Sequence, residues 1–248
     1  MNFPLNQILL GDCCDLMASL PPASVDFVLT DPPYMVGYQD RRGRSIHGDT
    51  DSAWLKPAFR QLFRLLKNDS LCVSFYGWSK TDAFFEAWKS AGFRVVGHIA
   101  FPKRYTSTTR LMRYQHESAY LLAKGNPAPS EHLIGDVIEF TNTGNKVRPT
   151  QKPLSALLPM IESFCPRGGV VLDPFAGSGS TCLAARMVGR NYLGMEIDPT
   201  FHEASCRRLA SFMSRLASIV VTPTASDDQA HGERGSTRSE HHEVHEAA

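Results

Sequence analysis

The chain has 248 residues, of which 42% are hydrophobic and 21% charged, with a formal net charge of +1 at pH 7. These values are typical of a globular protein of one or two domains, and no apolar run reaches the roughly 20 residues of a membrane span. The first residues lack the basic and apolar segments of a signal peptide, so a cytoplasmic location is expected. Six cysteines without a Cys-x-x-Cys pair indicate neither a disulfide framework nor a zinc site, and no metal is expected.

The small net charge hides an asymmetry along the chain. Residues 223–248 carry six acids against two arginines and lack apolar periodicity, so we expect a disordered acidic tail whose histidines have no metal role. The remaining residues are basic by five charges, and some of the cations cluster: Arg41, Arg42 and Arg44 form one group, and Lys103, Arg104, Arg110 and Arg113 form another. Basic clusters are usually solvated surface, and they indicate nucleic acid only when they flank a catalytic site.

Strands and helices are expected to alternate along the first half of the chain. Apolar spacing predicts strands at 7–10, 25–30, 71–76, 94–101 and 117–123, and helices at 15–20, 54–67 and 81–91. The polar stretch 35–52 is long for a connection, which indicates a functional or disordered loop. Residues 125–145 are expected to be rich in loops.

The alternation continues to the end of the apolar part of the chain. Helices are predicted at 153–164, with a kink or a late start at Pro159, and at 180–188 and 201–217; strands are predicted at 170–172 and 191–196. This order predicts an α/β fold with a mostly parallel twisted sheet and helices on both faces. We expect a single domain over residues 1–222.

One motif, Asp31-Pro32-Pro33-Tyr34, follows the predicted strand 25–30, at the end where open α/β sheets bind ligands. The two prolines fix two φ angles and remove two backbone donors, which leaves outward-facing carbonyls. A carboxylate, a rigid carbonyl and an aromatic face within four residues suit a planar ligand that carries an amino group. Taken alone, an ordinary strand-ending turn explains the motif equally well.

A second motif begins at Asp173 and connects a predicted strand to a predicted helix. Gly177 and Gly179 let the backbone approach a ligand closely. The third glycine of the dinucleotide fingerprint is absent at Cys182, and the lysine of a P-loop is absent too. Glu196 ends the next strand, where an acid accepts hydrogen bonds from ribose hydroxyls. The pattern predicts a pocket for a nucleoside that carries positive charge instead of phosphate, which is a description of S-adenosylmethionine.

With both motifs in place, the sequence resembles the β class of amino-group DNA methyltransferases, and specifically the short adenine-N6 enzymes that plasmids and phages carry alone. The resemblance covers most of residues 7–210 and includes Gly11-Asp12 and the run Arg148-Pro149-Thr150-Gln151-Lys152-Pro153. It implies a Rossmann-like fold for S-adenosylmethionine-dependent methyl transfer, circularly ordered so that the catalytic tetrapeptide precedes the cofactor loop. Met35 departs from the family pattern, which often has Asn there, and Arg148 replaces a frequent His.

The resemblance also implies a role for each matching residue. The catalytic residues would be Asp31, Pro32, Pro33 and Tyr34, and the cofactor-binding residues would be Asp12, Thr150, Lys152, Asp173, Phe175, Gly177, Gly179 and Glu196. Asp12 would contact the adenine of the cofactor, Glu196 its ribose, and Lys152 would close over its methionine side. Both arginine-rich clusters would contact DNA beside the catalytic pocket, through salt-dependent phosphate contacts.

The implied reaction is methylation of adenine N6 in double-stranded DNA after the base has been extruded from the duplex. A small insertion at about 102–148 would hold the target-recognition elements, and its size predicts a short or relaxed target sequence. Cytosine-N4 methylation, methylation of RNA or of a protein amide, and a catalytically silent DNA-binding regulator remain alternatives. The sequence leaves open the oligomeric state, a homodimer included, and any pairing with a restriction enzyme.

Overall fold

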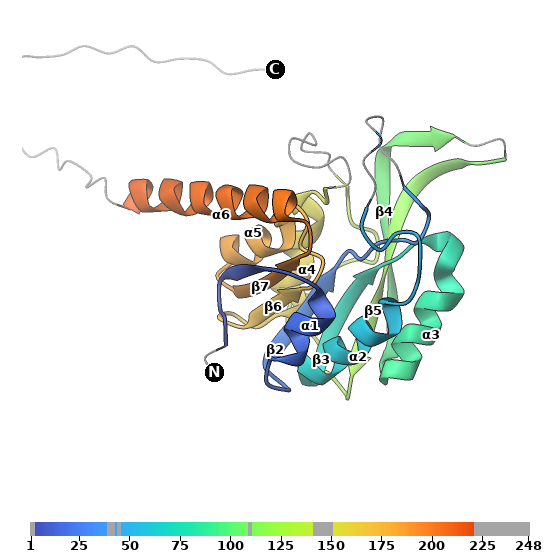
Figure 1. The fold of residues 1–248 in the computed structure, drawn as a ribbon, viewed down its shortest axis with the longest axis horizontal. Coiled ribbons are helices and arrows are strands. Elements are labelled where there is room, and N and C mark those ends of the chain that lie inside the picture. The colour runs from blue at the N-terminus through green and yellow to red at the C-terminus, as the bar shows by residue number, and fades with distance from the viewer. Residues whose placement is uncertain (1–2, 39–42, 44–45, 109–110, 141–150, 221–248) are drawn as a thin grey trace, which may run out of the picture.

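The computed structural model describes residues 3–38, 43, 46–108, 111–140 and 151–220. In this part of the chain, one seven-stranded sheet has the order β1-β7-β6-β2-β3-β5-β4 (Figure 1). The strands are β1 (Gln7–Leu10), β2 (Val25–Thr30), β3 (Leu66–Phe75), β4 (Arg94–Thr108), β5 (Arg113–Lys124), β6 (Val170–Asp173) and β7 (Asn191–Glu196). Neighbouring strands run parallel except around β5, which is antiparallel to both β3 and β4. The predicted mostly parallel sheet is confirmed.

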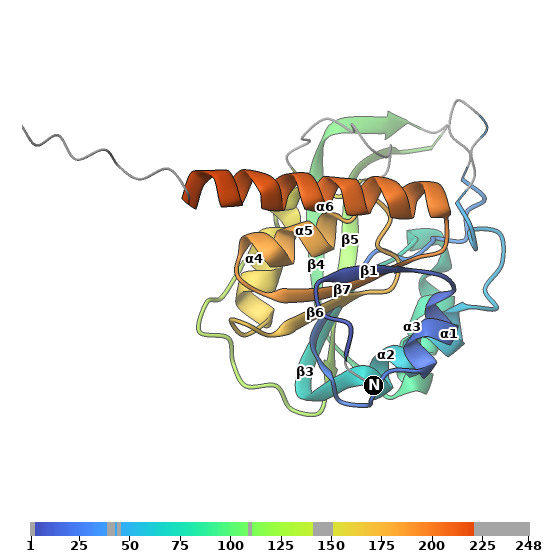
Figure 2. The same cartoon turned by 60° about the vertical axis from the view of Figure 1, so that its left-hand side comes forward.

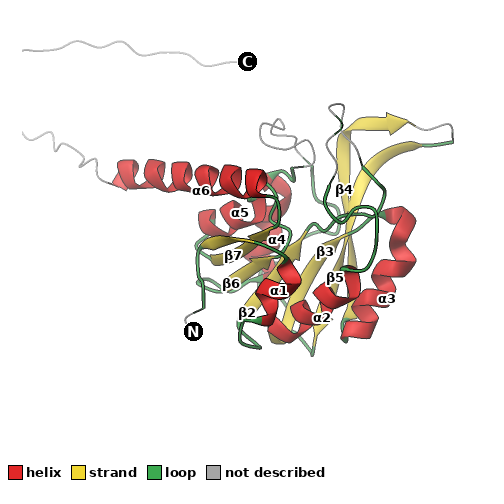
Figure 3. Cartoon of the chain, viewed as in Figure 1, coloured by secondary structure: helices red, strands yellow, loops and turns green. Residues whose placement is uncertain are grey.

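Helices cover both faces of the sheet, as predicted (Figure 3). The helices α1 (Cys13–Ala18), α2 (Leu55–Leu65) and α3 (Thr81–Ala91) pack on one face, and α4 (Leu154–Phe164), α5 (Ser180–Met187) and α6 (Pro199–Val220) pack on the other. Each face buries its own apolar layer, with Phe59 and Trp88 in the first and Phe27 and Met160 in the second. The continuous apolar character of β2 follows, because its side chains are buried on both faces.

Most predicted boundaries lie within a few residues of the observed ones. Helix α3 matches its prediction and ends at Gly92, whose φ of 106° gives the left-handed C-cap that glycine permits. Pro159 lies inside α4, and α6 begins at Pro199, which is a favourable first helical residue. Strands β3, β4 and β5 are longer than predicted, and the first residues of β3 fall where the end of a helix was expected. Together β4 and β5 form an arm that projects beyond the sheet (Figure 1).

The parallel strands bring their carboxyl ends to one edge of the sheet, visible also in the turned view (Figure 2). The tetrapeptide follows β2, the glycine turn follows β6, and Glu196 ends β7. Antiparallel β5 starts at this same edge, because Phe75 at the end of β3 pairs with Ala119. The fold therefore collects segments from both ends of the chain at one edge.

Two further expectations concern the tail of the chain and membrane-spanning helices. The predicted acidic tail, 223–248, lies outside the described residues. Among the helices that the structure describes, none combines the length and the apolar character needed to cross a bilayer.

Candidate active site

A cavity of about 480 Å³ lies at the carboxyl edge, and both predicted motifs line it. Asp31, Pro32, Pro33 and Tyr34 form one part of its wall; Pro174, Phe175, Glu196 and Ile197 form another. Strand pairing explains this meeting, since β6 lies directly between β2 and β7. A ligand in this cavity can touch the tetrapeptide and the start of the glycine turn at once, whereas Gly177 and Gly179 are not among the lining residues.

A network of ion pairs holds the tetrapeptide. The Asp31 carboxylate accepts a hydrogen bond from the Tyr34 hydroxyl on Oδ1 (2.8 Å), and its Oδ2 lies 2.8 Å from Lys152 Nζ. The Lys152 ammonium also donates to the Tyr34 hydroxyl (3.1 Å) and lies 2.9 Å from Glu117 Oε2. The other oxygen of Glu117 lies 2.9 Å from Lys103 Nζ. Two carboxylates and two ammonium groups thus balance each other and fix the orientation of Asp31.

The ionisation of this network follows from its charges. Burial alone would raise the pKa of Glu117, but Lys152 and Lys103 beside it lower that pKa to about 2. Burial would lower the pKa of Lys152, but Asp31 and Glu117 raise it well above its usual range. Burial, together with the Asp31 charge, raises the pKa of the Tyr34 phenol. At neutral pH the site therefore contains an ionised Glu117, a charged Lys152 and a neutral Tyr34.

The backbone around the tetrapeptide is tightly constrained. Met35, directly after it, has a φ of 58°, in the left-handed region that Asn tolerates better than Met. This conformation gives a physical reason why Asn suits that position. On the other side, a Cβ atom added to Gly77 would lie only 2.8 Å from the carbonyl oxygen of Tyr34. The β3 end therefore needs glycine to pass beside the tetrapeptide.

The glycine turn is tied to β7 by Glu196. The backbone N–H groups of Gly177 and Asp198 each donate to one Glu196 carboxylate oxygen, both at 2.8 Å. Gly177 and Gly179 have φ values of 52° and 72°, which glycine adopts without strain. Glu196 lines the cavity as well, and a carboxylate has lone pairs left for further donors.

Asp173 lies behind the cavity wall, where it is only 3% exposed. Its Oδ1 accepts the backbone N–H of Phe175 (3.1 Å), and burial raises its pKa to about 7. A nearby cation would stabilise its ionised form. The predicted acid therefore lies where it favours positive charge in the adjoining space.

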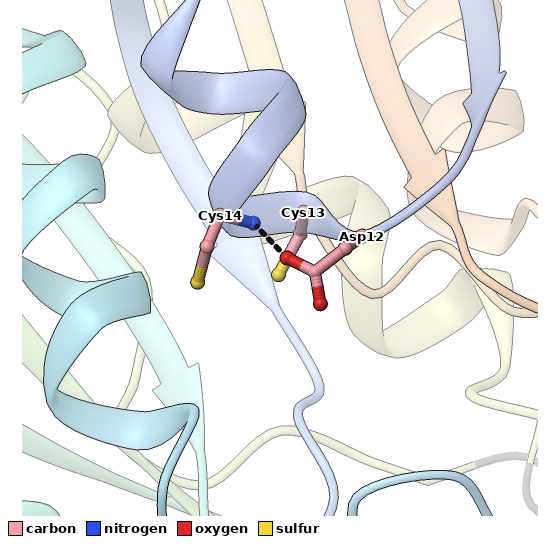
Figure 4. Close-up of side chains that lie close together, drawn as sticks. All are labelled: Asp12, Cys13 and Cys14. Atoms are coloured by element: carbon pink, nitrogen blue, oxygen red, sulfur yellow. Dashed lines mark hydrogen bonds between the residues drawn. The ribbon is translucent and has the colours of Figure 1, made fainter.

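Asp12 lies at the cavity rim, at the N-terminus of α1. Its Oδ1 accepts the backbone N–H groups of Cys14 (2.8 Å) and Asp15 (3.3 Å), a typical N-cap (Figure 4). Figure 4 also shows the Cys13 and Cys14 thiols beside this carboxylate, with one polar atom of each residue within 4.8 Å of the others. These two hydrogen bonds hold the Asp12 carboxylate in one orientation at the rim of the cavity.

Sequence reasoning missed three residues of the site. Glu117 is predicted only as the first residue of a strand, although a charged residue in a strand of a buried sheet indicates a functional or paired group. Trp54 packs edge-on against Phe175 (5.1 Å between ring centroids) and lines the cavity. Asp49 is buried, lines the cavity and accepts the N–H of Tyr38 (2.6 Å). The available signal was the length of the polar stretch 35–52.

The predicted DNA-contacting and lid residues are only partly described. Arg41, Arg42, Arg44, Arg110 and Thr150 lie outside the described residues, and Arg104 lies on β4 but its side chain is outside the described set. Arg113 is exposed, as a phosphate contact requires. The Lys103 ammonium faces Glu117 and its side chain is only 13% exposed, so its contact with DNA stays a prediction. Lys152 reaches the tetrapeptide, a contact that the resemblance did not imply.

Comparisons with known proteins agree with this architecture. A family model described as DNA methylase matches residues 25–207. The protein YubD of Escherichia coli strain K12, described as a methylase, is 51% identical over 207 residues, which cover 84% of this chain and 91% of YubD.

Two solved structures share the fold. TTHA0409 of Thermus thermophilus, solved in complex with S-adenosyl-L-methionine, superposes with a TM-score of 0.64 at 23% identity, covering 83% of this chain and 95% of its own. The cytosine-N4-specific PvuII DNA methyltransferase superposes with a TM-score of 0.68 at 15% identity, covering 88% and 97%. The expected methyltransferase fold is confirmed.

Proposed function

Because the chain belongs to the N6/N4 family of DNA methylases, we propose that it transfers a methyl group from S-adenosylmethionine to the N6 amino group of adenine in DNA. The shared cavity is the observation that carries this proposal, since Asp31 and Pro32 line the same space as Phe175 and Glu196. Adenine is favoured over cytosine because the tetrapeptide starts with Asp, whereas Ser is commoner in cytosine-N4 enzymes. The motif order, with the tetrapeptide first, is that of the β class.

The residues of the cavity fit S-adenosylmethionine. Glu196 offers carboxylate oxygens to a ribose, and Phe175 and Trp54 form an aromatic wall against which an adenine can lie. The buried Asp173 favours a cationic group, such as a sulfonium or an ammonium, in the adjoining space. Asp12 at the rim offers its second oxygen to an adenine amino group.

S-adenosylmethionine supplies an electrophilic methyl group on a positively charged sulfur. In the proposed mechanism, the Asp31 carboxylate and the Pro32 carbonyl accept the two N6 hydrogens, which directs the nitrogen lone pair at the methyl carbon. The N–C bond forms as the C–S bond breaks, the electron pair stays on sulfur, and the surplus N6 proton leaves through Asp31 to water. Tyr34 supports the base by stacking, and Lys152 keeps the Asp31 carboxylate oriented.

The DNA substrate would reach this pocket as an extruded base, since N6 is otherwise paired inside the duplex. Arg113, and the arginines outside the described residues, would contact phosphates, while the segment 102–148 would read base edges. We propose a short or relaxed target sequence because so few side chains are available for reading. A methylation map with a long, strict motif would contradict this part of the proposal.

The decisive experiment treats DNA with the protein and labelled S-adenosylmethionine, digests the product and identifies the nucleosides by mass. N6-methyladenine is expected; N4-methylcytosine would support the cytosine alternative, and DNA binding without any labelled nucleoside would support a silent regulator. RNA and protein incubated in parallel test the remaining alternative.

The Asp31→Ala variant assigns the chemistry to the tetrapeptide. It should abolish methyl transfer while calorimetry finds S-adenosylhomocysteine binding largely unchanged, because the ion pair and the hydrogen bond of the Asp31 carboxylate go to Lys152 and Tyr34. Glu117 remains as a partner for Lys152 in this variant, and thermal unfolding checks that the variant, which loses one of the two carboxylates of the network, is folded in the assay. Full activity of the variant would refute the assigned role.

A further inference from the structure

A stacked pair of aromatic rings lies at the edge of the sheet where the cavity opens. Trp78 begins the short 3-10 helix η1 (Trp78–Lys80) that follows β3, and its side chain is 67% exposed. Tyr114 of β5 stacks on the indole with ring centroids 5.4 Å apart and planes 24° apart. A tryptophan that keeps this exposure with one face covered has its other face open to solvent. The pair is therefore a flat aromatic surface with a free side.

One ring comes from a segment that lies beside the tetrapeptide, and the other comes from a strand that lines the cavity. Trp78 follows Gly77, whose backbone passes so close to Tyr34 that an added Cβ would meet the tyrosine's carbonyl oxygen at 2.8 Å. Tyr114 precedes Glu117 on β5, and Glu117 lines the cavity. The aromatic pair thus lies within a few residues of the tetrapeptide network along two separate segments of the chain.

The arm next to this pair has the charge that a polyanion requires. Beyond Pro102, β4 and β5 continue away from the sheet with Ser107 opposite Tyr114 and Thr108 opposite Arg113 (Figure 1). The sequence from 104 to 116 contains three arginines and no acid. Arg113 is exposed on the arm and Lys80 is exposed in η1, so exposed cations lie close in sequence to both rings.

We propose that Trp78, supported by Tyr114, is a stacking platform for a DNA base that loses its neighbour when the target base is extruded. This inference rests on the proposed function and adds a second nucleobase contact outside the catalytic pocket. Extrusion breaks stacking and pairing at a cost that the protein must offset, and an aromatic side chain offsets it for any base, because every base has a π-face. The contact is apolar and neutral, so it is distinct from the phosphate contacts of the arm.

The test compares DNA affinity and its salt dependence in Trp78→Ala, Trp78→Phe and Arg113→Gln. Fluorescence anisotropy with a labelled duplex, measured in the presence of S-adenosylhomocysteine over a range of salt, gives both quantities. Trp78→Ala should weaken binding roughly 5- to 150-fold at every salt concentration, with the slope of log Kd against log salt unchanged. Trp78→Phe should retain most of the affinity, and Arg113→Gln should reduce the slope by about one.

Met187→Ala is the matched control, since Met187 is a large apolar side chain that is 43% exposed at the C-terminal end of α5, outside the segments proposed to contact DNA. It should bind DNA as the wild type does. An affinity of Trp78→Ala within twofold of the wild type, or a loss equal to that of Met187→Ala, would overturn the platform. Nucleoside analysis of the wild-type product is separate from these measurements, so failure of the proposed methylation and failure of the platform are distinguishable.

Discussion

Replacing Glu117 by glutamine tests the buried charge network directly. Glu117 is the one residue of the described network that contacts both lysines, with 2.9 Å to Lys103 and 2.9 Å to Lys152. Glutamine keeps the shape and can still accept a hydrogen bond, but it removes the negative charge. The variant then has two ammonium groups and only the Asp31 carboxylate to balance them, which is an uncompensated buried charge.

The expected loss of stability follows from the ionisation of Glu117. Its pKa in the folded protein is about 2, against 4.5 for an unperturbed glutamate, which corresponds to roughly 3 kcal/mol of stability. Because the folded pKa is depressed, this stability is present above about pH 4.5 and is lost as the pH falls through about 2. The side chain is 20% exposed, so solvent screening reduces the expectation to roughly 2–3 kcal/mol.

Thermal and urea unfolding at pH 7.5 measure this loss, and Glu86→Gln is the matched control. Glu86 also pairs with a lysine, at 2.6 Å from Lys56, but both side chains are largely exposed. Glu117→Gln should lower Tm by roughly 4–12 °C for a chain of this size, whereas Glu86→Gln should change the stability by no more than about 0.5 kcal/mol. The difference in the free energy of unfolding between Glu117→Gln and the wild type should become smaller as the pH falls toward 3.5. Equal small losses for the two variants at pH 7.5 would refute the reasoning.

Two other residues give sharp expectations. Asp173→Asn should stabilise the cofactor-free protein by roughly 2–4 kcal/mol at pH 8 but by less at pH 5, because burial raises the pKa of this carboxyl from 3.8 to about 7 and the stability of its neutral form is lost as the pH rises through 7. Urea unfolding at the two pH values measures this stability difference, and an equal difference at pH 5 and pH 8 would contradict the expectation. The same ionisation predicts that S-adenosylmethionine binding near pH 7 releases a proton, which calorimetry in buffers of different ionisation enthalpy detects; a buffer-independent enthalpy would count against it. Gly77→Ala should lower kcat while leaving S-adenosylhomocysteine affinity unchanged, because its Cβ would displace the backbone of Tyr34. An unaltered kcat would mean that the tetrapeptide tolerates the shift.

The alternation of apolar runs was sufficient to predict the sheet and its helices. Strand β2 and helix α3 were identified at their observed bounds, because a buried strand and a capped amphipathic helix carry strong local signals. The arm of β4 and β5 was missed beyond Phe101 and before Glu117. The sequence from 103 to 116 contains no apolar run of strand length, so no local signal marks the residues that pair there.

The local motifs of the site could be predicted from the sequence. The contacts that join distant segments through the order of the strands could not. The tetrapeptide and the glycine turn each form a local pattern, and both line the cavity. Glu117 reaches them only because β5 runs antiparallel beside β3, and strand order of that kind is not written in local spacing. The contact of Lys152 with Asp31 has the same origin, since a tertiary ion pair joins segments that are distant along the chain.

The position of β2 in the sheet has a consequence for biosynthesis. On one side β2 pairs with β3, which follows soon along the chain, but its other partner is β6, which a ribosome completes only late. Until then, the nascent protein leaves one edge of this mostly apolar strand unpaired, which is the kind of surface that aggregates or recruits chaperones. A gene split between β5 and β6 should therefore yield two insoluble halves, and recovery of activity would require that both fragments be produced together.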